Sequence, residues 1–228
     1  MATQPFPWLL GDEAFDAVYP PEVRRISHRF WTPVETARRA ATLLHDAGSR
    51  NVLDVGSGVG KFALVAAATF EDLIVTGVEQ RAGLVEAARA ARRALGITNV
   101  RLLLGDATEV PWQPYDGFYF YNSFAENLFD PDDRIDDRAP LSFARFARDV
   151  QRTWRLFGTV GVGTNIATYY GCSGRVPCTF ELAHQEAAGS GWLRLWTQTD
   201  ATPDGSFFVE DGEHIVRHPA EGAPHLPT

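Results

Sequence analysis

The central part of the chain alternates between short aliphatic runs and longer stretches in which apolar residues recur every three or four positions. Runs of about five residues, bounded by glycine and polar residues, are typical of strands buried on both faces of a parallel sheet. The pattern therefore predicts an open α/β sheet with helices on both faces. The expected strands cover residues 51–55, 73–78, 100–104, 117–121 and 158–163.

Amphipathic helices are predicted before and between these runs. Ahead of the first run, one helical face that can end at Gly48 carries the apolar residues Val34, Ala37, Ala41 and Leu44. Further segments with helical spacing cover residues 84–95, 141–156 and 179–188. Closing strands are expected at 192–199 and 207–210.

The start of the first of these helices has its own signature. Thr32 can cap the helix, Pro33 suits the first helical position, and Glu35 completes a capping box with Thr32. This helix ends the first of three parts into which the chain divides. A helical N-terminal cap, a sheet domain and a polar C-terminal tail are expected at residues 1–48, 49–210 and 211–228.

Composition and charge narrow the functional classes. The 228 residues are 45% apolar and 22% charged, as in ordinary globular proteins, and this length suits one domain with appendages. With 29 acidic against 21 basic residues, the net charge of −8 repels phosphate backbones and anionic lipids, so neither nucleic acid nor a membrane is an expected partner. The first ten residues lack the basic flank of an export signal, and the longest apolar stretch, 62–70, is too short to span a bilayer. We therefore expect a cytoplasmic protein.

Polar residues follow each of the first four predicted strands. The first strand leads through Asp54 into the small-residue loop 56–60, and the next three end at Glu79, Asp106 and Asn122. Each residue alone has a simpler explanation as a turn or cap residue. Because the carboxyl ends of parallel strands meet at one edge of a sheet, the four together predict a ligand site there.

The loop after the first strand decides which ligand is expected. Small residues let a ligand approach the backbone, and an acid about 20 residues further on can accept the hydroxyls of a ribose, so an adenosine-containing cofactor is predicted. A dinucleotide fingerprint needs glycine where Lys61 stands. A P-loop fails as well, because Val55 and Phe62 occupy its glycine and Ser/Thr positions. Lys61 is therefore expected as a solvated residue at the start of a helix.

Three short motifs in order, Leu-Asp-Val-Gly-Ser-Gly-Val-Gly at 53–60, Gly-Val-Glu at 77–79 and Gly-Asp-Ala at 105–107, resemble the cofactor motifs of class I S-adenosylmethionine-dependent methyltransferases. The resemblance covers roughly residues 30–165. It implies a Rossmann-like, open and mostly parallel seven-stranded sheet with S-adenosylmethionine as the cofactor. The implied cofactor-binding residues are Asp54, Gly56, Ser57, Gly58 and Gly60 for the methionine part, Glu79 for the ribose hydroxyls, and Asp106 with Ala107 for the adenine edge. Gln80, next to Glu79, is expected as a further cofactor-binding residue.

The methyl acceptor should lie beyond the fourth strand, at Asn122-Ser123-Phe124. This tripeptide is similar to the Asn/Asp-Pro-Pro-aromatic motif of amino-methyltransferases, with Ser123 and Phe124 in place of the two prolines. Together with the glycine loop it also resembles the non-SET histone-lysine methyltransferases. Under this interpretation Asn122 orients the acceptor and Glu126 takes a proton. The alternative is that Asn122 caps a turn, Phe124 packs, and Glu126 has a structural role.

Two residues ahead of the first long helix are candidates for closing the pocket. Trp31 and Thr32 precede a helix that must lie near the first strand, and in related methyltransferases an N-terminal segment often folds over the cofactor. Core packing explains Trp31 equally well.

No pattern in the sequence predicts a metal site. The charge run 130–138 includes two arginines that offset part of its acidic charge, so a solvated loop is the favoured interpretation. No His/Asp/Glu cluster has ligand spacing. Cys172 and Cys178 lack the spacing of metal or redox sites, and we expect both as reduced thiols.

We therefore predict a methyltransferase that uses S-adenosylmethionine on a small-molecule acceptor, with a protein side chain as the less favoured acceptor. Three other classes stay open. An NAD-dependent oxidoreductase is disfavoured by Lys61, and a non-catalytic cofactor-binding protein is suggested by the altered residues after Asn122. An aminopropyl transferase should carry more acidic groups at the end of the fourth strand.

Overall fold

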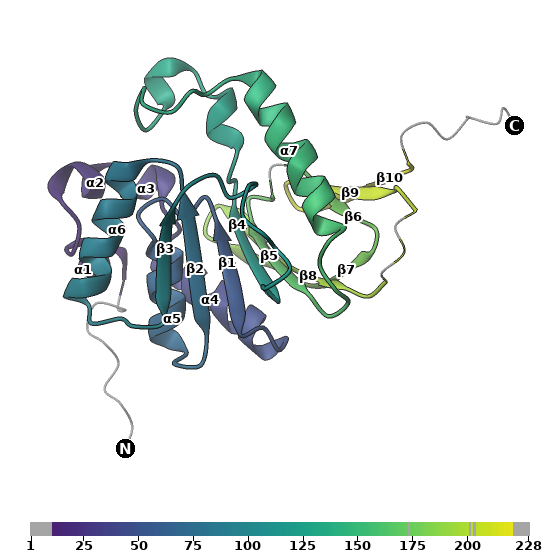
Figure 1. The fold of residues 1–228 in the computed structure, drawn as a ribbon, viewed down its shortest axis with the longest axis horizontal. Coiled ribbons are helices and arrows are strands. Elements are labelled where there is room, and N and C mark those ends of the chain that lie inside the picture. The colour runs from purple at the N-terminus through teal and green to yellow at the C-terminus, as the bar shows by residue number, and fades with distance from the viewer. Residues whose placement is uncertain (1–10, 173, 201, 203, 221–228) are drawn as a thin grey trace, which may run out of the picture.

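The structure, a computed structural model, describes residues 11–172, 174–200, 202 and 204–220. Its main sheet has the strand order β3-β2-β1-β4-β5-β8-β7 (Figure 1). Strands β1 to β5 are parallel, β8 is antiparallel to β5, and β7 is antiparallel to β8. This arrangement confirms the predicted Rossmann-like, mostly parallel seven-stranded sheet. The strands are β1 (Asn51–Val55), β2 (Ile74–Glu79), β3 (Val100–Leu104), β4 (Gly117–Tyr121), β5 (Asn165–Tyr169), β7 (Phe180–Ala188) and β8 (Gly191–Gln198).

Helices cover both faces of this sheet because successive strand residues point to opposite sides. Val52 of β1 packs into the core formed with α4 (Val34–Asp46), α5 (Lys61–Thr69) and α6 (Ala82–Ala94). Its neighbour Leu53 packs into a second core, with α7 (Phe143–Phe157). None of the helices in the described part of the chain has the length and apolar content needed to cross a bilayer.

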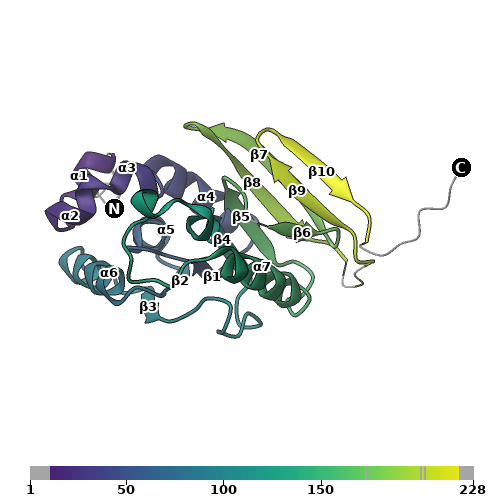
Figure 2. The same cartoon turned by 90° about the horizontal axis from the view of Figure 1, so that it is seen from above.

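The N-terminal region is helical, as predicted. Three short helices precede α4 and lie beside it and α5 (Figure 2). They are α1 (Asp12–Asp16), α2 (Pro21–Arg25) and α3 (Ser27–Phe30). Residues 1–10 of the predicted cap lie outside the described residues.

A small second sheet, with the order β10-β9-β6, stands at the β7 end of the main sheet (Figure 2). Its strands are β6 (Arg175–Pro177), β9 (Phe207–Asp211) and β10 (His214–His218). Glu210 of β9 reaches the main sheet, where it accepts hydrogen bonds from Thr168 and Trp196 and pairs with Arg194 at 3.2 Å. The predicted polar tail is therefore wrong for residues 211–220, which include a strand, and residues 221–228 lie outside the described part of the chain.

Two sequence-based assignments of elements are wrong. Residues 158–163 form a turn after α7 rather than a strand, and the fifth strand is β5. The strand β5 was not predicted because it contains the polar residues Asn165 and Thr168. Both are buried, and hydrogen bonds to other segments satisfy their side chains. The segment 179–188 is the strand β7 rather than a helix. Pairing with β8 and a register shift between Leu182 and His184 outweigh its helical spacing.

The expected capping box at Thr32 is also wrong. Pro33 takes the cap position of α4 and offers no side-chain hydrogen bond. The Val34 N–H instead donates to Asp12 Oδ1 at 2.8 Å, while Thr32 Oγ1 lies 3.0 Å from the hydroxyl of Tyr119. The helix α4 is therefore capped by Asp12, which lies 22 positions before Val34, and a local sequence motif cannot indicate such a distant cap.

Candidate functional site

A cavity lies at the carboxyl edge of β1 to β4, where the sequence places its polar strand ends. Two segments that follow the sheet strands, α7 and the short 3-10 helix η2 (Ala125–Leu128), also contribute to its wall. The cavity brings together most of the predicted site residues. These are Trp31, Gly56, Gly58, Glu79, Gln80, Asp106, Ala107, Asn122, Phe124 and Glu126.

A second, smaller cavity adjoins the first and shares Trp31, Gly56 and Tyr121 with it. Three other predicted residues line this smaller cavity, namely Thr32, Asp54 and Ser57. The remaining one, Gly60, lines neither, and its role is to let the chain turn close to α6. A Cβ at Gly60 would lie 3.2 Å from Ala88 and from Leu102.

The loop after β1 depends on glycine for its shape. Gly56, Gly58 and Gly60 have φ values of 75°, 54° and 73°, in the left-handed region that other residues rarely adopt. A Cβ on Gly58 would lie 2.6 Å from the ring of Trp31. The loop therefore exposes bare backbone on one side and receives the Trp31 indole on the other.

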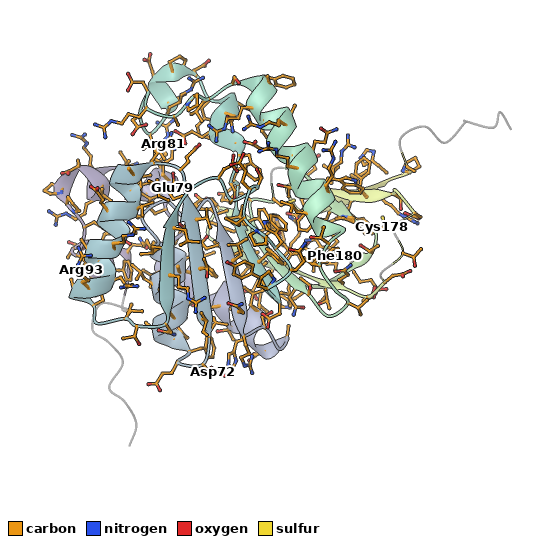
Figure 3. All side chains as sticks on the ribbon, in the orientation of Figure 1. Asp72, Glu79, Arg81, Arg93, Cys178 and Phe180 are labelled. Carbon is orange, nitrogen blue, oxygen red and sulfur yellow. The ribbon has the colours of Figure 1, made fainter. Side chains whose placement is uncertain are left out.

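Glu79 ends β2 and holds its carboxylate against this loop (Figure 3). Its Oε2 accepts the Gly58 N–H at 3.2 Å, and its Oε1 accepts the Arg81 N–H at 2.8 Å. Burial raises the pKa of Glu79, and the two backbone N–H donors partly oppose that rise. Each carboxylate oxygen keeps a second lone pair, so the group can still accept hydroxyls of a ligand in the cavity.

Asp54, the fourth residue of β1, is a buried carboxyl group with an unused oxygen. It is 4% exposed, and its Oδ2 has no hydrogen-bond partner. Burial, followed by the nearby charge of Glu79, raises the pKa of Asp54 to about 8. A buried polar atom without a partner is costly, so this oxygen is suited to a cationic or hydrogen-bond-donating ligand group.

Asp106 makes the turn contacts considered from the sequence and also lies in the wall of the cavity. Its Oδ1 accepts the Thr108 N–H at 2.8 Å and the Thr108 hydroxyl at 2.7 Å, which is a turn interaction. Its Oδ2 lies 3.7 Å from a guanidinium nitrogen of Arg145 on α7. The residue still lines the cavity together with Ala107. The turn therefore fixes the carboxylate in the cavity wall.

Asn122 directly follows β4 in a left-handed conformation, with φ of 48°. Asparagine tolerates this region better than most residues, and such backbone conformations concentrate at functional sites. The Asn122 N–H donates to the carbonyl of Gly171 at 3.2 Å, which joins the ends of β4 and β5. Next to it, Ser123 Oγ is buried in the cavity wall and has no hydrogen-bond partner.

Glu126 lines the cavity, but its carboxylate is engaged. Glu126 Oε1 accepts from the Arg81 guanidinium at 2.9 Å and from the Ile135 N–H at 2.7 Å. These two hydrogen bonds tie Glu126 to Arg81 and to the backbone at residue 135. The geometry therefore favours the structural alternative for Glu126.

The N-terminal cap is fastened to the glycine loop at several points. The Tyr19 hydroxyl donates to the Val59 carbonyl at 3.0 Å, and Trp31 packs on Gly58.

The prediction that Lys61 is solvated is wrong. Its side chain is 2% exposed, and its Nζ lies 2.7 Å from both Asp12 and Asp16 of α1. Helix α1 covers the start of α5, which no local pattern around Lys61 could indicate.

The sequence analysis missed two residues that line the cavity and a third that contacts one of them. Arg81 follows Glu79 by two positions and is buried. Tyr121 lines both cavities. Tyr170 follows β5 with a φ of 58°, is 44% exposed, and has its ring 6.0 Å from that of Tyr121. Correct placement of β5 would have put Tyr170 at the same sheet edge as Asn122.

The described residues contain no group of three or more His, Cys, Asp or Glu residues that could hold a metal ion. In the charge run 130–138, Asp133 pairs with Arg29 and Asp136 pairs with Arg81. Both cysteines are free thiols. Burial raises the pKa of Cys172 to about 12, which makes its thiol unreactive.

Residues 52–136 match a family model described as a methyltransferase domain. The structure is similar to an RNA methyltransferase from Salinibacter ruber in complex with S-adenosyl-L-homocysteine, with 19% identity, a TM-score of 0.55, and 76% of this chain and 96% of that chain covered. It is also similar to precorrin-6y C5,15-methyltransferase from Geobacter metallireducens GS-15, with 10% identity, a TM-score of 0.51, and coverage of 75% and 92%.

A third similar structure is the PH0226 protein from Pyrococcus horikoshii OT3, with 16% identity, a TM-score of 0.51, and 80% of this chain and 93% of that chain covered. At these identities the likenesses establish the fold alone. No curated protein matches the sequence.

Proposed function

We propose that this protein transfers a methyl group from S-adenosylmethionine to a small-molecule acceptor, because residues 52–136 match the methyltransferase-domain family model. The observation that carries the proposal is Asp54, whose buried, unpartnered oxygen lies beside a bare glycine loop and next to Glu79 on the same sheet edge. This set of donors and acceptors fits a cofactor with an ammonium group at one end and a ribose at its centre.

The cavity residues supply a place for each part of that cofactor. Asp54 would hold the ammonium group, and the backbone of the loop from Gly56 to Gly60 would accommodate the methionine chain. Glu79 would accept the ribose hydroxyls through its free lone pairs. Asp106 with Ala107 would meet the adenine edge, and Gln80 would be a further contact of the cofactor. When bound, the cofactor supplies an electrophilic methyl group on a sulfonium, without phosphate charge, which agrees with the carboxylates around the loop.

The acceptor end of the cavity is the part near Asn122. There the side chains of Trp31, Tyr121 and Phe124 provide apolar walls that exclude water from the reacting methyl group. Asn122 would orient the acceptor through its side-chain carbonyl, so that the attacking atom lies about 3 Å from the methyl carbon. Positioning is the main contribution that a protein makes to such an in-line displacement.

A nitrogen acceptor suits this site better than one that must first lose a proton from oxygen. Glu126 is held by Arg81, and Glu79 and Asp106 are bonded to neighbouring backbone groups, so none of these carboxylates is well placed as a general base. A neutral amine attacks with its own lone pair and needs only its N–H oriented, which an amide carbonyl can do. A protein side chain would satisfy the same chemistry and is the alternative acceptor.

Incubation of a metabolite extract with a methyl-labelled cofactor, followed by mass spectrometry, tests the proposal. We expect a labelled small amine with wild-type protein and no label with the Asp54→Asn variant. Cofactor binding without label in any metabolite or protein would instead support the non-catalytic interpretation. Label on protein alone would replace the small-molecule acceptor with a side chain.

A further inference from the structure

The chain between β4 and α7 crosses the cofactor cavity before it returns to the sheet. We call residues 123–142 the crossing segment; it contains η2 and the 3-10 helix η3 (Pro131–Asp133) and stands above β2 and β4 in Figure 1. Phe124, Asn127, Phe129 and Ile135 of this segment line the cavity. A ligand in the cavity is therefore covered by the crossing segment.

One side chain, that of Arg81, holds this segment at two places. Its Nη2 lies 2.9 Å from Glu126 Oε1, and its Nε lies 2.9 Å from Asp136 Oδ1. Glu126 and Asp136 are ten positions apart in the sequence, so Arg81 contacts both ends of the turn 126–136. Glu126 Oε1 also accepts the Ile135 N–H at 2.7 Å, so the two ends of this turn are hydrogen-bonded to each other as well as to Arg81.

The backbone of the same residue contacts the carboxylate assigned to the ribose. The Arg81 N–H donates to Glu79 Oε1 at 2.8 Å, and Figure 3 shows Arg81 between Glu79 and the crossing segment. The Arg81 side chain is 6% exposed. Charge-assisted hydrogen bonds in such a buried place are stronger than exposed ones, and removal of one partner leaves the others uncompensated.

A second ion pair provides a natural comparison. Arg29 of the N-terminal cap pairs with Asp133 of the same crossing segment at 2.6 Å, but the two side chains are 43% and 55% exposed. Exposed pairs of this kind contribute little to stability because solvent screens them. The buried ion pairs of Arg81 should therefore contribute more to the stability of the closed crossing segment than the exposed pair of Arg29.

We propose that Arg81 is a positioning residue whose side chain keeps the crossing segment closed over the cofactor cavity. The assignment of the ligand rests on the proposed function, whereas the closure is a property of the chain itself. Entry or exit of a ligand requires the segment to open, and opening separates Arg81 from both carboxylates. Arg81 therefore slows ligand release.

Hydrogen exchange in the ligand-free protein tests the closure without any reaction. In Arg81→Met, amides of residues 125–137 should exchange at least tenfold faster than in wild type, while those of β1 and β4 keep their rates. Arg81→Lys should give an intermediate result, because lysine keeps the charge but cannot bridge two carboxylates with a planar fork. Asp133→Asn, the exposed control on the same segment, should change exchange by less than twofold.

Dissociation of S-adenosylhomocysteine provides the second measurement, by displacement with excess unlabelled ligand. We expect release about tenfold faster from Arg81→Met and unchanged from Asp133→Asn. If Arg81→Met fails to fold, Asp136→Asn carries the test with a smaller effect in the same direction. Unchanged exchange and unchanged release in the Arg81 or Asp136 variants would overturn the inference. A protein that binds no S-adenosylhomocysteine would contradict the proposed function, yet its exchange data would still decide whether Arg81 holds the segment.

Discussion

The indole of Trp31 packs against the bare backbone of Gly58, so closely that a Cβ on Gly58 would lie 2.6 Å from the ring. This contact joins the N-terminal cap to the loop expected to hold the methionine part of the cofactor. Trp31 is 6% exposed in the core, as packing requires, and it also lines the cavity, where its role in closing the pocket stays a prediction.

Replacement of Gly58 by alanine should therefore destabilise the protein through two effects. The new methyl group collides with Trp31, and alanine resists the φ of 54°. We expect a loss of about 2–4 kcal/mol in the free energy of unfolding, measured with urea. Gly96→Ala is the matched control, because Gly96 has a φ of 69° with nothing within 4 Å of a Cβ, and it should lose only about 1 kcal/mol. Equal losses in the two variants would show that the Trp31 contact has no energetic role.

The buried carboxyl of Asp54 should make the ligand-free protein less stable as pH rises. Its folded pKa of about 8 lies above the ordinary value of 3.8, so the folded state binds a proton that the unfolded state has lost. The contribution to stability is full below pH 4 and is lost progressively up to about pH 8. Asp54→Asn should remove this decline, so its stability relative to wild type should rise between pH 5 and pH 8 by a few kcal/mol at most. Thermal or urea unfolding across this range measures the difference, and parallel curves for the two proteins would refute the assignment.

Two substitutions at Asn122 separate its backbone role from its side-chain role. Asn122→Gly keeps the left-handed conformation, whereas Asn122→Ala strains it and should cost about 1 kcal/mol of stability relative to the glycine variant. Both variants remove the amide. If Asn122 orients the acceptor, both should lose at least tenfold in methyl-transfer rate while S-adenosylhomocysteine affinity stays within about threefold. Normal transfer by Asn122→Gly would restrict the residue to a turn.

The fold could be predicted from the sequence where a strand coincides with a short apolar run bounded by glycine or polar residues. Strands β1, β3 and β4 begin and end where the aliphatic runs do. The assignment failed at β5, because Asn165 and Thr168 interrupt its apolar pattern. It failed at β7 because pairing with β8 stabilises a strand where the spacing predicts a helix. Hydrogen bonds and pairings between distant segments are not visible in a local hydrophobic pattern.

The candidate site follows the same division. Asp54, Glu79 and Asn122 could be placed together because parallel strands share a carboxyl edge. The roles of Lys61 and Arg81 could not be predicted, because their charged partners are distant in the sequence. The partners of Arg81 lie 45 and 55 positions away, and those of Lys61 lie on α1. A lone basic residue in a sequence is ordinarily expected at the surface, and only the packed structure reveals that these two are buried in ion pairs.

Calorimetric titration of the wild-type protein and of Glu79→Gln with S-adenosylmethionine tests the central claim most directly, with Glu109→Gln as an exposed acidic control and NAD as the competing ligand. The account predicts that wild type and Glu109→Gln bind S-adenosylmethionine and not NAD, and that Glu79→Gln binds it about 10 to 100 times more weakly, as expected when hydrogen bonds to a charged group are weakened. Binding of NAD alone, or equal affinity for S-adenosylmethionine in wild type and Glu79→Gln, would contradict it.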